Sequence, residues 1–260
     1  MAELTAPGHA MVRVPIAPMY GEPYVASPQI SQRLSGHLVD LLDQQEDWFL
    51  ARGMDRYEGW IHRGFLAPVP QNGSKRAADM TRISLGCFTR DPAGQHRSLP
   101  LGARLSPDEV VQVGTTVDVA HLAERFPRDP LAITRSAQVL FEGTPYLWGG
   151  ITPWGADCSG FVQTIYGLHD VPLPRDAWQQ SEVGTDAGGL DDLQAADLAF
   201  FSDREDKWVT HVAIALGSRH LVHLALGRGG YHRENIADTG DDYVAALRGR
   251  FLKARRVLPR

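Results

Sequence analysis

The stretch WGADCSGFVQTIYG, residues Trp154–Gly167, places one of only two cysteines directly before an apolar run. The apolar residues of this run recur at helical spacing, and they are Phe161, Val162, Ile165, Tyr166 and Leu168. Asp157 is a suitable N-cap residue, and Gly167 is a suitable end. The pattern predicts a helix that buries one face and carries Cys158 in its first turn.

This position suits a nucleophile. Free backbone N–H groups and the helix dipole favour a thiolate at a helix start, so we expect the pKa of the Cys158 thiol to be lowered. Ser159 and Gly160 are small enough to leave the first turn open to a substrate. The same N–H groups are possible oxyanion donors.

A nucleophilic thiol needs a base, and the segment WVTHVAIALGSRHLVHLAL offers one. Residues 209–216 alternate like a strand, residues 217–219 form a three-residue turn, and residues 220–226 return. If Leu216 pairs with His220, His211 and His223 become diagonal neighbours on one face. The layout predicts Cys158 as nucleophile, His211 as base and His223 as the residue that orients His211.

Other interpretations stay open on spacing alone. A buried cysteine is usually inert, and strand histidines usually fill a core or a surface. Zinc also binds cysteine and histidine, but the second pair of ligands that a structural site needs is absent, and Cys87 lies far away in the sequence. We expect no metal and no cofactor, and we expect Cys87 to be a small buried apolar residue.

Composition sets further bounds. The 260 residues, with 43% hydrophobic and 22% charged residues, allow one large domain or two to three small ones. The net charge of −5 and the lack of a basic run interleaved with aromatic residues argue against nucleic acid as a partner. No segment is long and apolar enough to span a membrane, and the first residues do not read as a signal peptide, so we expect a cytoplasmic protein with reduced thiols.

Three zones follow one another along the chain. Short β-like runs occupy about residues 12–70, PQNGSKRAAD (Pro70–Asp79) is typical of a linker, and a second β-like zone runs from Met80 to about Val119. DPLAITRSAQVLFEG then predicts a helix with Asp129 as N-cap, Pro130 at its first position and an end at Gly143.

Six motifs in order resemble the NlpC/P60 cysteine peptidases: YLWGG, DCSGFV, LPRDAWQQ, DLAFF, THVAIAL and finally His223. The resemblance covers about half the chain and implies an α+β, papain-like catalytic domain at residues 131–260. In that fold the helix bearing the cysteine packs on an antiparallel sheet. It implies the same roles for Cys158, His211 and His223. The chain departs from the family at Ala196, where a glycine is usual.

The β zones ahead of this domain resemble bacterial SH3-like (SH3b) modules. SGHLVDLLDQQEDWFLARGMDRYEGWIHRGFL carries the pattern of one module, and the second zone matches more weakly. The resemblance implies two small SH3-like β-barrels, at residues 8–70 and 75–122. This order of modules is similar to the γ-D-glutamyl-L-diamino acid endopeptidases that recycle murein peptides.

That resemblance also implies substrate-binding residues. Glu22, Tyr57 and Asp176 match positions that bind the free amino group of an N-terminal L-Ala, and an ammonium does need such acceptors. The remaining residues expected at the substrate groove are Tyr146, Trp148, Asp157 and Ser159. Each of these assignments has an alternative. Glu22 can be a solvated surface residue, and Tyr57 can be a core residue. Asp176 can be an ordinary loop residue, and Trp148 can serve only to pack against its neighbours.

The expected substrate is a free murein tri- or tetrapeptide, with lysine or diaminopimelate after the cleaved bond. A monomer is plausible. Two alternatives stay open, a secreted hydrolase of intact cell wall and an SH3b wall-binding protein.

Overall fold

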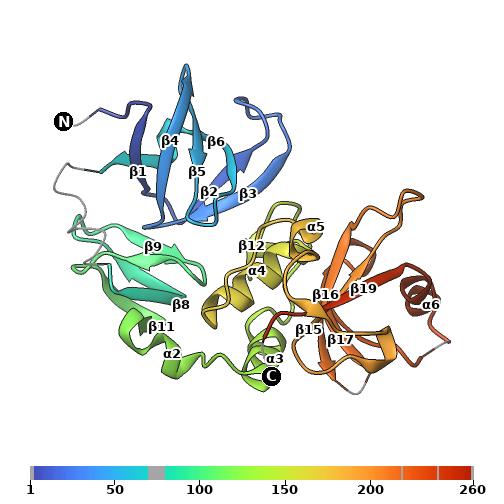
Figure 1. Ribbon diagram of the computed structural model, residues 1–260. Coiled ribbons are helices and arrows are strands. Elements are labelled where there is room, and N and C mark those ends of the chain that lie inside the picture. The colour runs from blue at the N-terminus through green and yellow to red at the C-terminus, as the bar shows by residue number, and fades with distance from the viewer. Residues whose placement is uncertain (1–2, 70–79, 218, 239, 259–260) are drawn as a thin grey trace. The chain divides into compact units, whose positions relative to one another are not determined.

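The computed structural model describes residues 3–69, 80–217, 219–238 and 240–258. The chain divides into two compact units, Met1–Arg125 and Phe126–Arg260 (Figure 1). The predicted linker at Pro70–Asp79 lies outside the described residues. No helix in the described ranges is long and apolar enough to cross a membrane.

The first sheet of the N-terminal unit has seven antiparallel strands in the order β3-β2-β6-β5-β4-β1-β7. Its strands are β1 (Gly8–Val12), β2 (Ile16–Tyr20), β3 (Gln29–Leu34), β4 (Leu38–Gln45), β5 (Trp48–Arg52), β6 (Glu58–His62) and β7 (Leu66–Pro68). The 3-10 helix η1 (Arg63–Phe65) joins the last two strands. Alternate side chains from these strands form one buried core around Met19, Leu41, Phe49 and Ile61.

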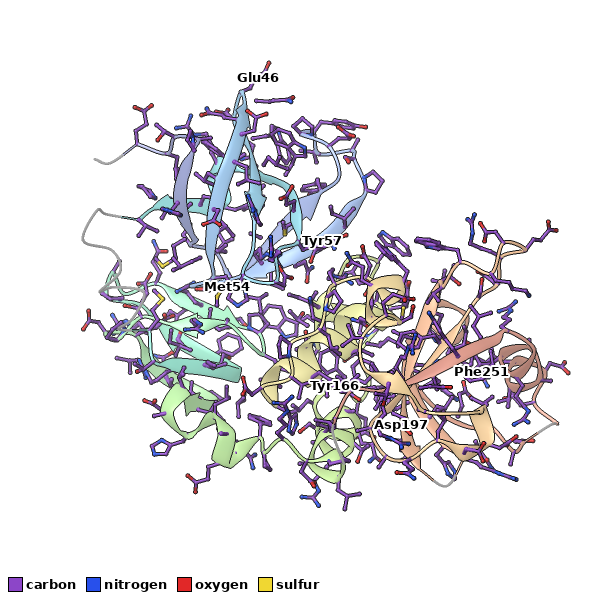
Figure 2. The ribbon with its side chains drawn as sticks, viewed as in Figure 1. Glu46, Met54, Tyr57, Tyr166, Asp197 and Phe251 are labelled. Atoms are coloured by element: carbon purple, nitrogen blue, oxygen red, sulfur yellow. The ribbon has the colours of Figure 1, made fainter. Side chains whose placement is uncertain are left out.

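The predicted SH3-like barrel stays a prediction for this sheet. Strands β3 and β7 form its two ends, and no pairing between them closes the sheet among the residues described. Met54 and Tyr57 lie in the connection from β5 to β6 (Figure 2).

The second sheet of this unit is built around β8 (Arg82–Arg90), which pairs antiparallel with three other strands. These strands are β9 (His96–Leu99), β10 (Arg104–Leu105) and β11 (Val110–Asp118). The 3-10 helix η2 (Val119–His121) and the short helix α2 (Leu122–Arg125) end the unit. Cys87 is 5% exposed on β8, as expected of a small buried residue, and both cysteines are free thiols.

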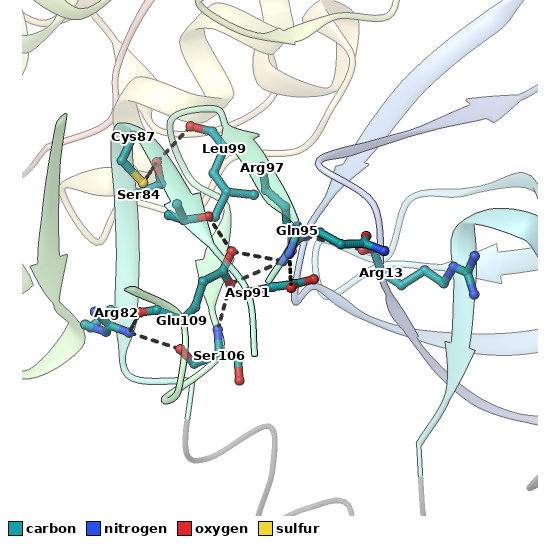
Figure 3. A network of polar contacts seen from close by, with 12 residues as sticks. Arg13, Arg82, Ser84, Cys87, Asp91, Gln95, Arg97, Leu99, Ser106 and Glu109 are labelled. Atoms are coloured by element: carbon teal, nitrogen blue, oxygen red, sulfur yellow. Dashed lines mark hydrogen bonds and ion pairs between the residues drawn. The ribbon is translucent and has the colours of Figure 1, made fainter. Parts of the chain in front are cut away.

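A partly buried arginine, Arg97, links the two sheets of this unit (Figure 3). Arg97 on β9 donates to both carboxylate oxygens of Glu109 at 3.2 Å, just before β11 of the same sheet. The same guanidinium donates to Ser35 Oγ at 2.6 Å and to the Arg13 carbonyl at 3.3 Å, in the segments that follow β3 and β1. Because the Glu109 side chain has no exposed surface, removal of Arg97 would leave a buried carboxylate without its partner cation, which is destabilising.

The C-terminal unit holds a six-stranded antiparallel sheet in the order β14-β19-β15-β16-β17-β18. Its strands are β14 (Thr185–Asp186), β15 (Asp197–Phe201), β16 (His211–Gly217), β17 (His220–Ala225), β18 (Gly230–Asn235) and β19 (Phe251–Arg256). Its helices are α3 (Pro130–Leu140), α4 (Cys158–Leu168), α5 (Ala177–Gln180) and α6 (Asp242–Gly249), with the 3-10 turns η3 (Leu190–Asp192) and η4 (Leu226–Arg228). A small hairpin, β12 (Ile151–Thr152) and β13 (Gly155–Ala156), precedes α4.

The sequence correctly predicted how α3 begins. Asp129 is its N-cap, with the carboxylate accepting the Ala132 N–H at 2.9 Å, and Pro130 is its first residue. The helix ends at Leu140, three residues before the predicted end at Gly143, because Phe141 already leaves the helical conformation.

Helix α4 packs on strands β16 and β17, so the predicted cysteine-bearing helix on an antiparallel sheet is confirmed. Tyr166 on α4 is fully buried, and its hydroxyl donates to the Ala196 carbonyl at 2.6 Å, just before β15 begins at Asp197 (Figure 2). Ala196 has φ +63°, a left-handed conformation that glycine adopts without strain. This explains why a glycine is usual at that position.

The β16–β17 hairpin has the predicted register but a different turn. Ile214 pairs with Val222 and Ala215 with Leu221, as expected. Gly217, rather than Leu216, then pairs with His220, because a bulge shifts the register after Ala215. The predicted three-residue turn is therefore wrong, and Ser218 within it lies outside the described residues.

Candidate active site

Cys158 is the first residue of α4 and is 7% exposed. The predicted cap is confirmed, because Asp157 Oδ1 accepts the Gly160 N–H at 2.7 Å. A Cβ on Gly160 would lie only 2.1 Å from the Gly150 carbonyl oxygen, so the first turn of α4 can approach the preceding loop only with glycine there. The cap and this close approach fix the thiol at the start of the helix.

The Cys158 thiol is protonated at rest. Burial raises its pKa to about 12, the Asp157 carboxylate adds to this, and the N–H groups of Val212 and Ser159 oppose it. The expected lowering of this pKa is wrong, because the loss of solvation outweighs the helix N-terminus in so buried a place. Ionising the thiol therefore requires a base beside it.

Two histidines lie in contact on the sheet that α4 covers. His211 begins β16 and His223 lies on β17, with His211 Nε2 2.8 Å from His223 Nδ1. The next residue after His211 is Val212, whose N–H acts on the Cys158 thiol, so the start of β16 lies beside the nucleophile. The predicted proximity of the two rings is confirmed.

Both imidazoles are neutral at rest. Burial lowers the pKa of His211 well below its usual value, and the charges of His223 and Arg250 act in the same direction. Burial also lowers the pKa of His223, although a hydrogen bond to Glu234 opposes this. A neutral imidazole can accept the thiol proton, which is the task of a general base.

A buried ion pair supports the start of α4. Arg175, almost fully buried, donates to Asp157 Oδ1 at 3.0 Å and to Oδ2 at 2.6 Å, and to Ser159 Oγ at 2.9 Å. Asp157 Oδ2 also accepts the Gly149 N–H at 2.8 Å. The carboxylate is thus engaged within the protein, while contact of Asp157 and Ser159 with substrate stays a prediction.

Sequence reasoning missed Arg175, although it stands inside the PRDA segment next to Asp176. A surface arginine and a buried one look alike in a sequence, because burial depends on the tertiary fold. The sequence offered one indication of a buried arginine: the acidic N-cap residue Asp157 would need a cation beside it if it were buried.

The other predicted groove residues of this unit differ in their surroundings. Tyr146 is half-buried, and burial raises its pKa, with a further contribution from the Asp157 carboxylate. Trp148 is 64% exposed, and its contact with substrate stays a prediction. Asp176 is the N-cap of α5, where its N–H donates to Gln179 Oε1 at 3.3 Å.

Glu22 and Tyr57 belong to the N-terminal unit. Glu22 is exposed in the connection from β2 to β3, where its N–H donates to Ser27 Oγ at 2.9 Å. Tyr57 is half-buried, and its N–H donates to Asp55 Oδ1 at 3.1 Å. The amine-binding roles of both residues stay predictions.

A cysteine at the start of a helix, packed on an antiparallel sheet that carries a histidine pair, is the arrangement of a papain-like cysteine peptidase. Residues 143–246 match the model of the NlpC/P60 family. The chain is 42% identical over 262 aligned positions to the γ-D-glutamyl-L-lysine dipeptidyl-peptidase of Bacillus cereus, and this alignment covers 88% of the chain and 75% of that enzyme. The chain therefore belongs to the NlpC/P60 family, and it is a cysteine peptidase.

Two further comparisons agree with this assignment. The γ-D-glutamyl-L-lysine dipeptidyl-peptidase of Bacillus subtilis is 38% identical over 112 residues, which is 38% of each chain. The crystal structure of an NlpC/P60 family protein from Bacillus cereus superimposes with a TM-score of 0.80 at 20% identity, over 97% of this chain and 100% of that one. This second likeness shows that the two proteins share a fold over 97% of this chain.

Proposed function

We propose that this protein cleaves the γ-D-glutamyl bond to a diamino acid in free murein peptides that begin with an unblocked L-Ala. The observation that carries the proposal is the 42% identity to an enzyme named γ-D-glutamyl-L-lysine dipeptidyl-peptidase over most of both chains. A dipeptidyl-peptidase removes two residues from a free N-terminus, so its substrate must present an amino group. Recycling of such peptides within the cytoplasm is part of the proposal.

The proposed chemistry is acyl transfer through Cys158. His211 accepts the thiol proton while the sulfur attacks the γ-carbonyl carbon of D-Glu, which breaks the thiol S–H bond and forms a tetrahedral oxyanion. The backbone N–H of Cys158, at the start of α4, is suited to stabilise this oxyanion. The intermediate collapses to a thioester as the C–N bond breaks and the leaving amine takes the proton from His211.

Hydrolysis of the thioester completes the cycle. His211 accepts a proton from water, whose oxygen attacks the thioester carbon. The C–S bond breaks, the thiol regains its proton, and L-Ala-γ-D-Glu is released. His223 holds the His211 ring through the 2.8 Å contact during both halves of the reaction.

Recognition of the free amino group by Glu22, Tyr57 and Asp176 is also proposed. Charge-assisted hydrogen bonds from an ammonium to carboxylates and a phenol are worth about 2–5 kcal/mol when largely desolvated. This corresponds to roughly 30- to several-thousand-fold in kcat/KM.

The test compares L-Ala-γ-D-Glu-L-Lys with its N-acetyl form. We expect N-acetylation to lower kcat/KM by at least about 30-fold, because it removes the charge and adds bulk. Intact sacculi should resist cleavage for the same reason, since their L-Ala is amide-linked to muramic acid. Asp176→Ala and Tyr57→Phe should each raise KM for the free peptide.

Comparable rates on the free and N-acetylated peptides would contradict the proposal. That outcome, with release of peptides from sacculi, would favour a hydrolase of intact cell wall. Binding to sacculi with no cleavage of any peptide would favour a wall-binding protein.

A further inference from the structure

A buried carboxylate lies behind the histidine pair. Glu234 on β18 has a side chain that is 3% exposed, and its Oε1 lies 3.3 Å from His223 Nε2. In the register of the sheet, His232 is directly opposite His223, so Glu234, two residues further along β18, is a diagonal neighbour on the same face. The sequence analysis gave Glu234 no role. Glu234 contacts His223 rather than the Cys158 thiol.

An arginine holds this carboxylate in one orientation. Arg228 Nε donates to Glu234 Oε1 at 2.8 Å, and a terminal nitrogen of the same guanidinium donates to Oε2 at 3.0 Å. That nitrogen also donates to Asp241 Oδ2 at 2.6 Å, and the guanidinium lies 4.4 Å from the centre of the Tyr243 ring. A planar fork bonded on two sides leaves the carboxylate little freedom to turn.

Glu234 is ionised at any pH at which the enzyme would work. Burial opposes its ionisation, but hydrogen bonds from His223 and Arg228 outweigh burial and hold its pKa at about 2. An ionised carboxylate only accepts hydrogen bonds. His223 must therefore donate to it, through a proton on Nε2.

This proton determines the tautomer of both rings. A neutral imidazole carries one N–H, so His223 with its proton on Nε2 has a bare Nδ1. That bare nitrogen can only accept, so His211 must donate through its own Nε2–H across the 2.8 Å contact. The remaining nitrogen of His211, Nδ1, is then unprotonated and free to accept the thiol proton.

We propose that Glu234 is a positioning residue that, through His223, keeps His211 in the tautomer able to accept the Cys158 proton. The inference rests on the proposed function, in which His211 is the base. The negative charge of Glu234 also favours the imidazolium that forms when the thiol ionises. The other charged or titratable groups around the pair are His232, Arg228, Asp241, Tyr243 and Arg250.

The direct test reads the tautomers in the wild-type protein. Nitrogen-15 NMR of labelled imidazoles, assigned with His211→Gln and His223→Gln variants, should show both rings neutral and protonated at Nε2 at pH 7–8. Protonation of either ring at Nδ1 in its neutral form would overturn the inference. This measurement needs no substrate and no change at Glu234.

A matched pair of variants tests the consequence. Glu234→Gln removes the charge and can present an NH₂ to His223, which would reverse both tautomers. Asp197→Asn is the control: Asp197 is 1% exposed and accepts from Arg256 at 2.8 and 2.6 Å, but it begins β15 at the opposite end from Phe201, which pairs with His211. Both variants thus remove the charge from a carboxylate paired with an arginine, although Arg228 keeps Asp241 as a second partner, and only Glu234→Gln touches the histidines.

Two measurements distinguish the variants. Glu234→Gln should lower kcat by about 10- to 100-fold with little change in KM, as expected of a group that acts through another. The pH at which iodoacetamide alkylates Cys158 at half its maximal rate should rise, because a less stable imidazolium supports less thiolate. Asp197→Asn should leave both kcat and the alkylation profile near wild-type.

Glu234 would have only a structural role if Glu234→Gln and Asp197→Asn lowered kcat equally. The same would follow if Glu234→Gln left the pH profile of Cys158 alkylation unchanged. The alkylation rate is measured on the Cys158 peptide by mass spectrometry, so it does not depend on cleavage of any substrate. If the murein peptide is not cleaved but the profile shifts as predicted, the proposed substrate fails and the positioning role stands.

Discussion

At the scale of single residues, His223 has both ring nitrogens engaged and no exposed surface. Nδ1 contacts His211 and Nε2 contacts Glu234. A glutamine side chain carries one acceptor and one donor group, so it can accept from His211 and donate to Glu234 in the same place. An alanine would leave the His211 N–H and the Glu234 carboxylate facing a void.

The two histidines should therefore differ in their response to substitution. His211→Ala removes the base and should lower kcat by about 10²- to 10⁴-fold. His223→Gln should lose less activity than His223→Ala, because it preserves the bond to the His211 ring. Steady-state kinetics with L-Ala-γ-D-Glu-L-Lys measure all three variants.

Two results would contradict these roles. Equal losses in His223→Gln and His223→Ala would mean that the imidazole itself, and not an orienting bond, is needed. Inhibition by a chelator would revive the zinc interpretation of Cys158 and the histidines, whereas we expect chelators to have no effect.

At the scale of elements, α4 depends on the ion pair between Asp157 and Arg175. Asp157→Asn keeps a good N-cap residue but removes the charge that Arg175, 2% exposed, is paired with. Breaking a buried pair from one side costs about 3–5 kcal/mol. Asp129→Asn at the N-cap of α3 is the control, because Asp129 is exposed and its substitution preserves the cap.

Urea unfolding should therefore show a large loss of stability for Asp157→Asn and a change of less than about 0.5 kcal/mol for Asp129→Asn. Similar small changes in both variants would mean that Arg175 finds another partner or water, and that the ion pair does not hold the start of α4.

Some elements of the site follow from local sequence, and others do not. Apolar spacing and the capping residues predicted α3 and α4, and alternation predicted the register that brings His211 near His223. The bulge at Gly217 was missed, because it changes the pairing by one residue without changing the alternation before it. Arg175 and Glu234 were missed because their burial depends on distant strands and helices.

At the scale of the whole molecule, the same limit applies to the β-rich N-terminal unit. Turn residues and alternation indicated its strands, but Arg97 joins its two sheets through Ser35 and the Arg13 carbonyl, more than 60 residues away in the sequence. Whether β3 and β7 form a barrel likewise depends on pairing between segments far apart in the chain. The expectation of a lowered thiol pKa failed for a related reason, since the desolvation of Cys158 arises from the folded unit as a whole.

The central claim is that one thiol of the molecule, Cys158, performs the chemistry. Each compact unit carries one buried free thiol, Cys87 in the first and Cys158 in the second, which gives a matched comparison. The measurement is turnover of L-Ala-γ-D-Glu-L-Lys by wild-type protein, Cys158→Ala and Cys87→Ala, each checked for folding by circular dichroism. We predict no detectable turnover for folded Cys158→Ala and near wild-type turnover for Cys87→Ala, whereas substantial turnover by Cys158→Ala would contradict the assignment of the nucleophile.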